Sequence, residues 1–126
     1  MAEIGSGGKF QQEYIELALK GIHNTLKYTG MISGTPEVPD KQVIVTSRKH
    51  IRCKSGGMAV VDVAPGQALK KGERFARIID IGSEKSEVET LVADQDMYVI
   101  AARVNPPVDT GDRIIFGALT WEDVKR

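Results

Sequence analysis

The stretch GGMAVVDVAPGQALKKGERFAR at residues 56–77 returns, with substitutions, as QDMYVIAARVNPPVDTGDRIIF at residues 95–116. Aligned without a gap, the two copies keep a constant offset of 39 positions from Met58 to Met97. Their apolar, glycine and basic positions correspond, for example Leu69 with Val108, Gly72 with Gly111 and Arg74 with Arg113. Such a repeat is typical of one supersecondary unit used twice. Because two copies are too few for a solenoid, we expect one small β domain with internal two-fold symmetry.

The sequence around the repeat alternates at the period of β-strands and is broken by glycine and proline. This pattern predicts strands at residues 41–46, 48–53, 58–63, 74–81, 87–92, 97–102 and 113–118. Val88 and Val92 are expected on the inner face of their strand. Short strands with closely spaced turns favour a small barrel or sandwich.

A helix is predicted before the β region, over Gln11–Tyr28. Its apolar residues fall on one face at helical spacing, namely Ile15, Ala18, Leu19, Ile22 and Leu26. Gly21 interrupts the helix at a cost of about 1 kcal/mol relative to alanine, so we expect another segment to approach it closely.

Composition shifts divide the chain into four parts. Residues 1–32 carry the helix, residues 33–40 form a linker with one glycine and two prolines, residues 41–121 form the β domain and residues 122–126 form a tail. The predicted class is therefore mostly β: a small domain like a barrel-sandwich hybrid, with an internal two-fold repeat, preceded by one N-terminal helix.

Charge and cysteine content exclude some classes of function. Lys and Arg together number 17, as do Asp and Glu, so a formal net charge of zero argues against nucleic acid or an anionic membrane as a partner. No apolar run is long enough to span a membrane, and no signal-peptide core is visible. The single cysteine, Cys53, excludes an internal disulfide. Together these features favour a cytoplasmic protein.

A basic stripe is the strongest candidate for a binding surface. Arg48, His50, Arg52 and Lys54 alternate along one predicted strand and should point to one side, with Ile51 and Cys53 on the other. They form either a solvated sheet face or a cationic rim for a carboxylate-bearing substrate, which arginine binds in bidentate fashion. The same alternation separates His50 from Cys53, so no metal site is predicted within this chain.

The repeated motif Leu/Val-x-x-Gly-Glu/Asp-Arg-Phe/Ile resembles the halves of biotinyl/lipoyl-type carrier domains. In those domains a modified lysine lies on the hairpin between the halves, near the place of Lys85. The flanking residues here, Gly82-Ser83-Glu84-Lys85-Ser86, differ from the carrier pattern. A carrier or binding module modified at Lys85 is therefore an alternative reading.

A second resemblance covers nearly the whole chain. The segments are Glu3-Ile4-Gly5-Ser6-Gly7-Gly8, Ala18-x-x-Gly21-Ile22-x-Asn24-x-Leu26-Lys27-x-x-Gly30-Met31, Ser55-Gly56-Gly57-Met58 and Lys71-Gly72-Glu73. In this order they resemble the C-terminal part of the succinylglutamate desuccinylase/aspartoacylase family, zinc-dependent amidohydrolases related to the zinc carboxypeptidases.

That resemblance implies a function divided between two parts of an enzyme. Glu3 would be the general acid/base of a deacylase acting on N-acyl amino acids. The family's zinc ligands, a His-x-x-Glu pair and a later His, belong to a larger N-terminal domain, and this sequence contains no His-x-x-Glu. We therefore expect zinc in the complete enzyme, none in this chain, and no activity from this chain alone. A third reading is an assembly domain, in which the apolar helix face joins a second copy as a homo-oligomer.

Overall fold

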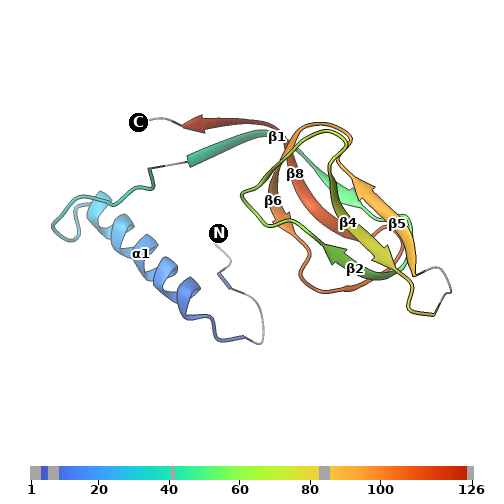
Figure 1. The fold of residues 1–126 in the computed structure, drawn as a ribbon. Coiled ribbons are helices and arrows are strands. Elements are labelled where there is room, and N and C mark those ends of the chain that lie inside the picture. Colours follow the sequence, from blue (N-terminus) through green and yellow to red (C-terminus); the bar gives the residue numbers. More distant parts are fainter. Residues whose placement is uncertain (1–3, 6–8, 41, 83–85, 125–126) are drawn as a thin grey trace. The chain divides into compact units, whose positions relative to one another are not determined.

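The chain folds into two compact units, Met1–Asp40 and Lys41–Arg126 (Figure 1). In the computed structural model, residues 4–5, 9–40, 42–82 and 86–124 are described. The first unit contains one helix and the second contains eight strands within these residues.

Helix α1 spans Gln12–Tyr28 and confirms the predicted helix to within one residue. It begins at Gln11, whose carbonyl accepts bonds from the amides of Tyr14 and Ile15. Its last residue, Tyr28, is followed by the C-cap Thr29 and then by Gly30, which adopts a φ of 73°. Glycine takes this left-handed conformation without steric cost, which is why it stops helices so often.

The segment after α1 is fastened to the helix by polar contacts. Asn24 donates from Nδ2 to the carbonyl of Glu37 at 2.6 Å and accepts the Glu37 amide at 2.9 Å. Lys20 Nζ lies 2.8 Å from a Glu37 carboxylate oxygen, and this bond and charge hold the pKa of Glu37 below its ordinary value. The proline-containing segment is therefore bound to α1 by Asn24 and Lys20.

The apolar side of α1 is uncovered. Ile15, Leu19 and Ile22 are 38%, 51% and 55% exposed, and α1 contains no buried residue. Apart from its chain neighbours and the backbone of α1 itself, no described atom lies within 4 Å of a Cβ placed on Gly21, so the close approach expected there is not found. In the described parts of the chain, no helix combines the length and apolar character that crossing a bilayer demands.

The second unit consists of two four-stranded antiparallel sheets. Their strands are β1 (Gln42–Arg52), β2 (Gly57–Val61), β3 (Ala68–Leu69), β4 (Arg74–Ile79), β5 (Glu87–Val92), β6 (Met97–Ala102), β7 (Pro107–Val108) and β8 (Arg113–Val124). The orders are β1-β8-β6-β3 and β5-β4-β2-β7, so neither sheet closes into a barrel among the described residues. The predicted class, mostly β with one helix, is confirmed.

β2 and β4 end two residues before the predicted positions, and the two-residue strands β3 and β7 were not expected. The larger differences are in β1 and β8. β1 is one bulged strand where two had been expected, with register shifts on either side of Ser47. β8 continues to Val124, six residues beyond Ala118, where the predicted strand ended. The reason is the same for both, because the first residues of β1 pair with the last residues of β8, as Gln42 does with Val124.

The two sheets are related strand by strand, as the repeat predicts. β4, β2, β7 and β5 of one sheet correspond in order to β8, β6, β3 and β1 of the other. Matching backbone bonds make the relation explicit: Cys53 exchanges bonds with Gly111 and Asp112, as Ala93 does with Gly72 and Glu73. Because β3 pairs with β6 and β7 with β2, each half completes the other's sheet.

The gap-free alignment is wrong by one residue in β2. Leu69 pairs with Met97, while its counterpart Val108 pairs with Gly57, so Met97 corresponds to Gly57 rather than to Met58. A one-residue slip exchanges the two faces of a strand. A bulge in β6, between Val99 and Ala101, then raises the offset from 40 to 41, and the loop after β6, two residues shorter than the loop after β2, returns it to 39.

Core packing explains why a glycine and a methionine can be equivalent. A Cβ on Gly57 would lie 3.1 Å from the side chain of Ile78, and a Cβ on Gly117 would lie 3.1 Å from the sulfur of Met97. Ile78 and Gly117 are themselves equivalent, because they stand opposite Glu89 and Lys49. Each half therefore pairs one large residue with one glycine, in opposite order, which keeps the packed volume similar.

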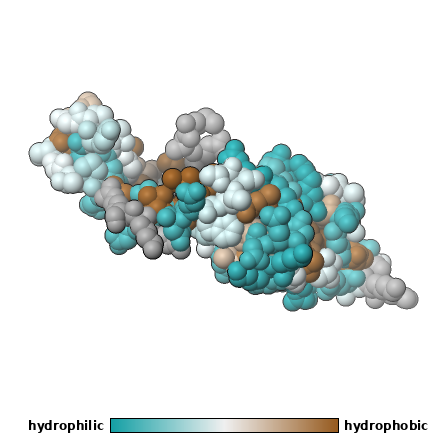
Figure 2. All heavy atoms as spheres, turned by 90° about the horizontal axis from the view of Figure 1, so that it is seen from above, coloured by the Kyte–Doolittle hydropathy of each residue, from teal (hydrophilic) through white to brown (hydrophobic). Residues whose placement is uncertain are grey.

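The core lies between the sheets and is filled from both halves. Phe75 and its counterpart Ile114 are 0% and 1% exposed. Val88 and Val92 were expected inside, but they are 40% and 50% exposed. The buried residue of β5 is Leu91, which is 5% exposed. Figure 2 shows a predominantly hydrophilic surface over the face of the β unit that it presents, with small hydrophobic patches.

Candidate functional site

Two of the residues singled out from the sequence, Glu3 and Lys85, lie outside the described residues. The other four, Arg48, His50, Arg52 and Lys54, lie on or directly after β1. All four are exposed, whereas Ile51 is half-buried and Cys53 is 2% exposed. The predicted alternation of β1 is therefore confirmed.

Arg48 and His50 share one aromatic neighbour on β8, Phe116. The imidazole of His50 stacks on the Phe116 ring, with centroids 4.2 Å apart and planes inclined by 17°. The guanidinium carbon of Arg48 lies 5.6 Å from the centroid of the same ring. This distance is within the range of a cation–π contact, so Phe116 holds both basic side chains against the sheet.

Arg52 is held further along the same strand. Its Nη1 donates to the carbonyl of Gly111 at 2.5 Å, and its register partner on β8 is Arg113. Gly111 has a φ of 90°, which favours glycine in this turn. The turn thus presents its carbonyl to Arg52 while placing a second arginine beside it.

Lys54 lines a groove between β1 and β5. This groove has a volume of about 400 Å³ and is lined by Lys49, His50, Ile51, Arg52 and Lys54 from one side and Glu89, Thr90, Leu91, Val92 and Asp94 from the other. Two contacts cross it. Lys49 Nζ meets Asp94 Oδ2 at 2.5 Å, and Glu89 Oε2 accepts the amides of Lys54 and Ser55 at 2.8 Å each. The groove therefore contains charges of both signs.

The pKa of His50 lies below its ordinary value of 6.5. The largest cause is loss of hydration against its neighbours, and the positive charges of Arg113, Arg52 and Arg48 add to it. A positive environment disfavours the imidazolium form. The lowered pKa of His50 thus reflects first its loss of hydration and second the positive potential of the three arginines.

Phe116 and Arg113 are functional candidates that the sequence did not reveal. Together with His50 and Ala101 they border a second hollow of about 260 Å³ on the outer side of β1, β8 and β6. Both residues lie on β8, far from the basic stripe in sequence, and only the β1–β8 register brings them to it. The sequence repeat aligned Arg113 with Arg74, but it gave no indication that Arg113 lies beside Arg52 and His50.

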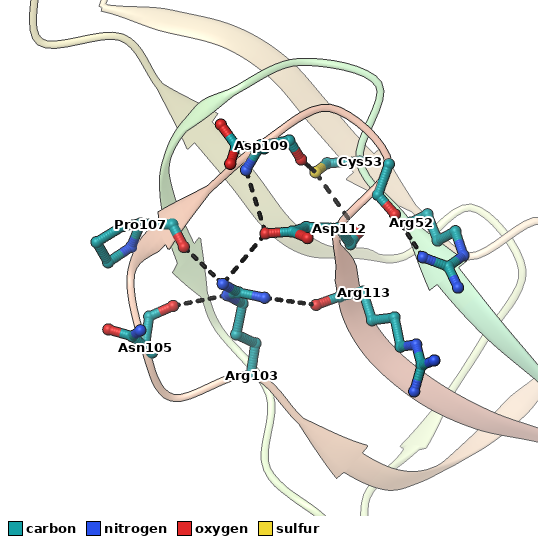
Figure 3. Close-up of polar contacts among 9 residues, drawn as sticks. Arg52, Cys53, Arg103, Asn105, Pro107, Asp109, Asp112 and Arg113 are labelled. Carbon is teal, nitrogen blue, oxygen red and sulfur yellow. Dashed lines mark hydrogen bonds and ion pairs between the residues drawn. The ribbon is translucent and has the colours of Figure 1, made fainter.

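Arg103 forms the polar network beside this hollow (Figure 3). Its guanidinium donates to the carbonyls of Asn105 at 2.7 Å and Pro107 at 2.6 Å, and lies 3.3 Å from Asp112 Oδ2. The Cys53 thiol donates to the carbonyl of Asp109 at 3.2 Å in the same turn. Arg103 thus uses its guanidinium to fasten residues 105–112, the segment before β8.

The described residues do not fit a zinc site. No three side chains of His, Cys, Asp or Glu gather closely enough among them to hold a metal ion. His50 is exposed on one face of β1, while Cys53 points into the core and donates its thiol hydrogen to carbonyls. A zinc site needs at least three protein ligands, so these residues provide no such site.

The fold defines a class: a helix-bearing segment followed by a two-sheet β domain, as found within succinylglutamate desuccinylase/aspartoacylase proteins. A structure of such a protein from Shewanella amazonensis SB2B matches 97% of this chain with a TM-score of 0.79 and 16% identity, over 35% of its own length. One from Rhodobacter sphaeroides matches 98% of this chain with a TM-score of 0.75 and 22% identity, over 39% of its length. At these identities the likeness is one of fold.

A curated relative is similar in sequence. The N-alpha-acetyl-L-2,4-diaminobutyric acid deacetylase of Halomonas elongata is 28% identical over 116 residues, which cover 89% of this chain. Those residues cover 34% of the deacetylase, so the chain spans about a third of its length. No family model matches the sequence.

Proposed function

We propose that this chain is the C-terminal accessory portion of a zinc-dependent amidohydrolase that removes acyl groups from N-acyl amino acids. The observation that carries the proposal is the match of 89% of the chain to one third of a deacetylase, together with the shared fold. We further propose that the portion is inactive alone. Zinc would be bound by the rest of the enzyme, because the described residues here offer no ligand set.

Glu3 has the proposed role of general acid/base in the complete enzyme. A carboxylate can take a proton from one reacting group and deliver it to another during amide hydrolysis. This assignment depends on the resemblance of Glu3-Ile4-Gly5-Ser6-Gly7-Gly8 to the family segment. The basic residues of β1 would attract the substrate's carboxylate, as arginine does in bidentate pairs.

The uncovered face of α1 is the proposed contact with the rest of the enzyme. Ile15, Leu19 and Ile22 are all more than one-third exposed. Burying apolar area yields about 25 cal/mol per Å², which favours covering such a face. If α1 joins a second copy instead, as in a homo-oligomer, sedimentation would show a concentration-dependent mass, and a monomer at all concentrations would exclude that reading.

The proposal can be tested first at the level of the gene. The reading frame upstream of Met1 should encode a segment with His-x-x-Glu and a later His. An upstream segment without these residues would remove the proposed parent enzyme.

Activity provides the second test. The purified chain, supplied with zinc and N-acetyl-L-2,4-diaminobutyrate or other N-acyl amino acids, should release no free amine. Co-expression with the His-x-x-Glu-bearing segment should restore hydrolysis. Glu3→Gln should then lower kcat by about 100-fold or more, whereas Glu13→Gln, an exposed carboxylate at the start of α1, should retain activity. Hydrolysis by the chain alone would contradict the proposed division.

The alternative is a carrier module modified at Lys85. Lys85 falls between β4 and β5, on the connection between the two halves of the β unit, which is where carrier domains bear their lysine. Intact mass after co-expression with a biotin or lipoate ligase distinguishes the two functions. An unmodified mass would exclude the carrier, and a mass increase abolished by Lys85→Arg would establish it.

A further inference from the structure

The outer face of β1 and β8 carries basic side chains that lack an acidic partner among the described residues. These are Arg48, Arg52 and Arg113, gathered near His50 and Phe116. Five basic side chains elsewhere do have an acidic partner: Lys20 with Glu37, Lys49 with Asp94, Lys70 with Asp96, Arg74 with Asp62 and Arg103 with Asp112. Arg48, Arg52 and Arg113 are distinguished by lying together around His50, so this face concentrates positive charge that no described acid neutralises.

The fold does not require basic residues at positions 50 and 52 of β1. His50 and Arg52 stand opposite Phe116 and Arg113 in the β1–β8 ladder. In the other half, Thr90 and Val92 occupy the equivalent positions, opposite Arg77 and Arg74. The equivalent sheet is therefore built with a threonine and a valine at these sites. The presence of His50 and Arg52 on β1 needs another explanation than folding.

Arg113 shows the difference between the halves most clearly. Its counterpart Arg74 lies 3.9 Å from the carboxylate of Asp62. The residue equivalent to Asp62 is Arg103, since the Asp62 amide bonds to Phe75 O and the Arg103 amide bonds to Ile114 O, at 2.9 and 2.8 Å. Arg74 therefore has the acid Asp62 at the position where Arg113 has a second base, Arg103. Arg103 meets Asp112, which leaves Arg113 without a described acid.

The hollow of about 260 Å³ lies beside these groups, with Phe116 and Ala101 offering apolar surface, Arg113 offering positive charge and the His50 imidazole offering a ring N–H donor. We propose that this hollow binds the oxyanion of a small organic acid, a carboxylate or a phosphate, at Arg113 and His50, with the apolar part of the ligand on Phe116 and Ala101. An arginine beside an aromatic surface suits such a ligand, because its fork bonds two oxygens at once.

This inference rests on the proposed function only for the choice of a carboxylate as the natural ligand. The test therefore uses binding and not hydrolysis. The imidazole signals of the purified 126-residue chain are followed by NMR while N-acetylglycine, inorganic phosphate or sodium chloride is added at equal ionic strength. His23, on α1, serves as an internal reference in the same sample.

We expect a saturable shift of the His50 signals and a rise in its pKa with N-acetylglycine or phosphate. If N-acetylglycine binds more tightly, the ligand is a carboxylate; if phosphate does, it is a phosphate. Arg113→Gln should weaken binding by about tenfold, because it removes a charge-assisted bidentate contact. Arg74→Gln, the equivalent substitution in the other half, should leave binding within about twofold.

Three outcomes would overturn the proposal: shifts that do not saturate, shifts that sodium chloride reproduces, or equal effects of the two arginine substitutions. Either variant can be checked for folding by its retained amide spectrum. Should Arg113→Gln fail to fold, Arg113→Lys provides the same test, since a point charge replaces the fork without removing the charge. Saturable anion binding by this chain, combined with no hydrolysis after co-expression with the His-x-x-Glu-bearing segment, would refute the proposed function and leave this site standing.

Discussion

Lys49 of β1 and Glu89 of β5 occupy equivalent positions in the two halves of the β unit, opposite Gly117 and Ile78 respectively. Each side chain crosses the groove between the two edge strands. Lys49 meets the carboxylate of Asp94, just after β5, and Glu89 accepts two amides just after β1. The same position of the repeat therefore links β1 to β5 in both halves, through a positive side chain in one and a negative side chain in the other.

The two crossing contacts should differ in strength. Glu89→Gln is expected to lower the free energy of unfolding by about 1–2 kcal/mol, because a carboxylate that accepts two amides acts like a helix cap. Lys49→Met should cost no more than about 1 kcal/mol, as a solvent-exposed ion pair does. Urea denaturation of the β unit measures both. A larger loss for Lys49→Met than for Glu89→Gln would contradict this ranking.

Gly57 and Gly117 should respond differently to alanine. Gly57 has a φ of 144°, and an added Cβ would lie 2.5 Å from the carbonyl oxygen of Ile79. Gly57→Ala should therefore cost about 2 kcal/mol or more. At Gly117 the nearest atom is the flexible Met97 sulfur at 3.1 Å, so Gly117→Ala should cost less. Thermal denaturation of both variants checks the order, and equal losses would show that the β2 backbone yields.

Cys53 should tolerate alanine because the other half already has alanine at that position. Cys53 and Ala93 are 2% and 1% exposed and make equivalent backbone bonds. We expect Cys53→Ala to lower the free energy of unfolding by about 1 kcal/mol, through the lost thiol contact with Asp109. Phe75→Ala, in the centre of the same core, should cost about 3–5 kcal/mol. Chemical denaturation distinguishes these values.

Stability should depend on pH through His50. Its pKa in the folded chain lies below the ordinary 6.5, so the unfolded chain binds a proton more tightly. The contribution of neutral His50 is therefore complete above about pH 6.5 and is lost as the pH falls towards the folded pKa. His50→Gln should flatten the profile of unfolding midpoint against pH in this window. An unchanged slope between pH 7 and 5 would show that His50 does not titrate as the structure indicates.

The sequence by itself determined the helix, the repeat and the outward direction of the β1 stripe, because these depend on local periodicity and turn chemistry. The spacing of Ile15, Leu19 and Ile22 fixes a helical face, and alternation around Ile51 fixes a strand. The order of motifs also indicated the fold of the succinylglutamate desuccinylase/aspartoacylase proteins before any geometry was known.

Only the tertiary structure decided the pairing across strands. Met58 looked equivalent to Met97, yet the registers of β3 and β7 assign that place to Gly57. Phe116 and Arg113 joined the basic stripe because β8 lies beside β1, a contact between residues more than 60 positions apart. Register depends on how large and small side chains complement one another in the shared core, and that information belongs to no single segment.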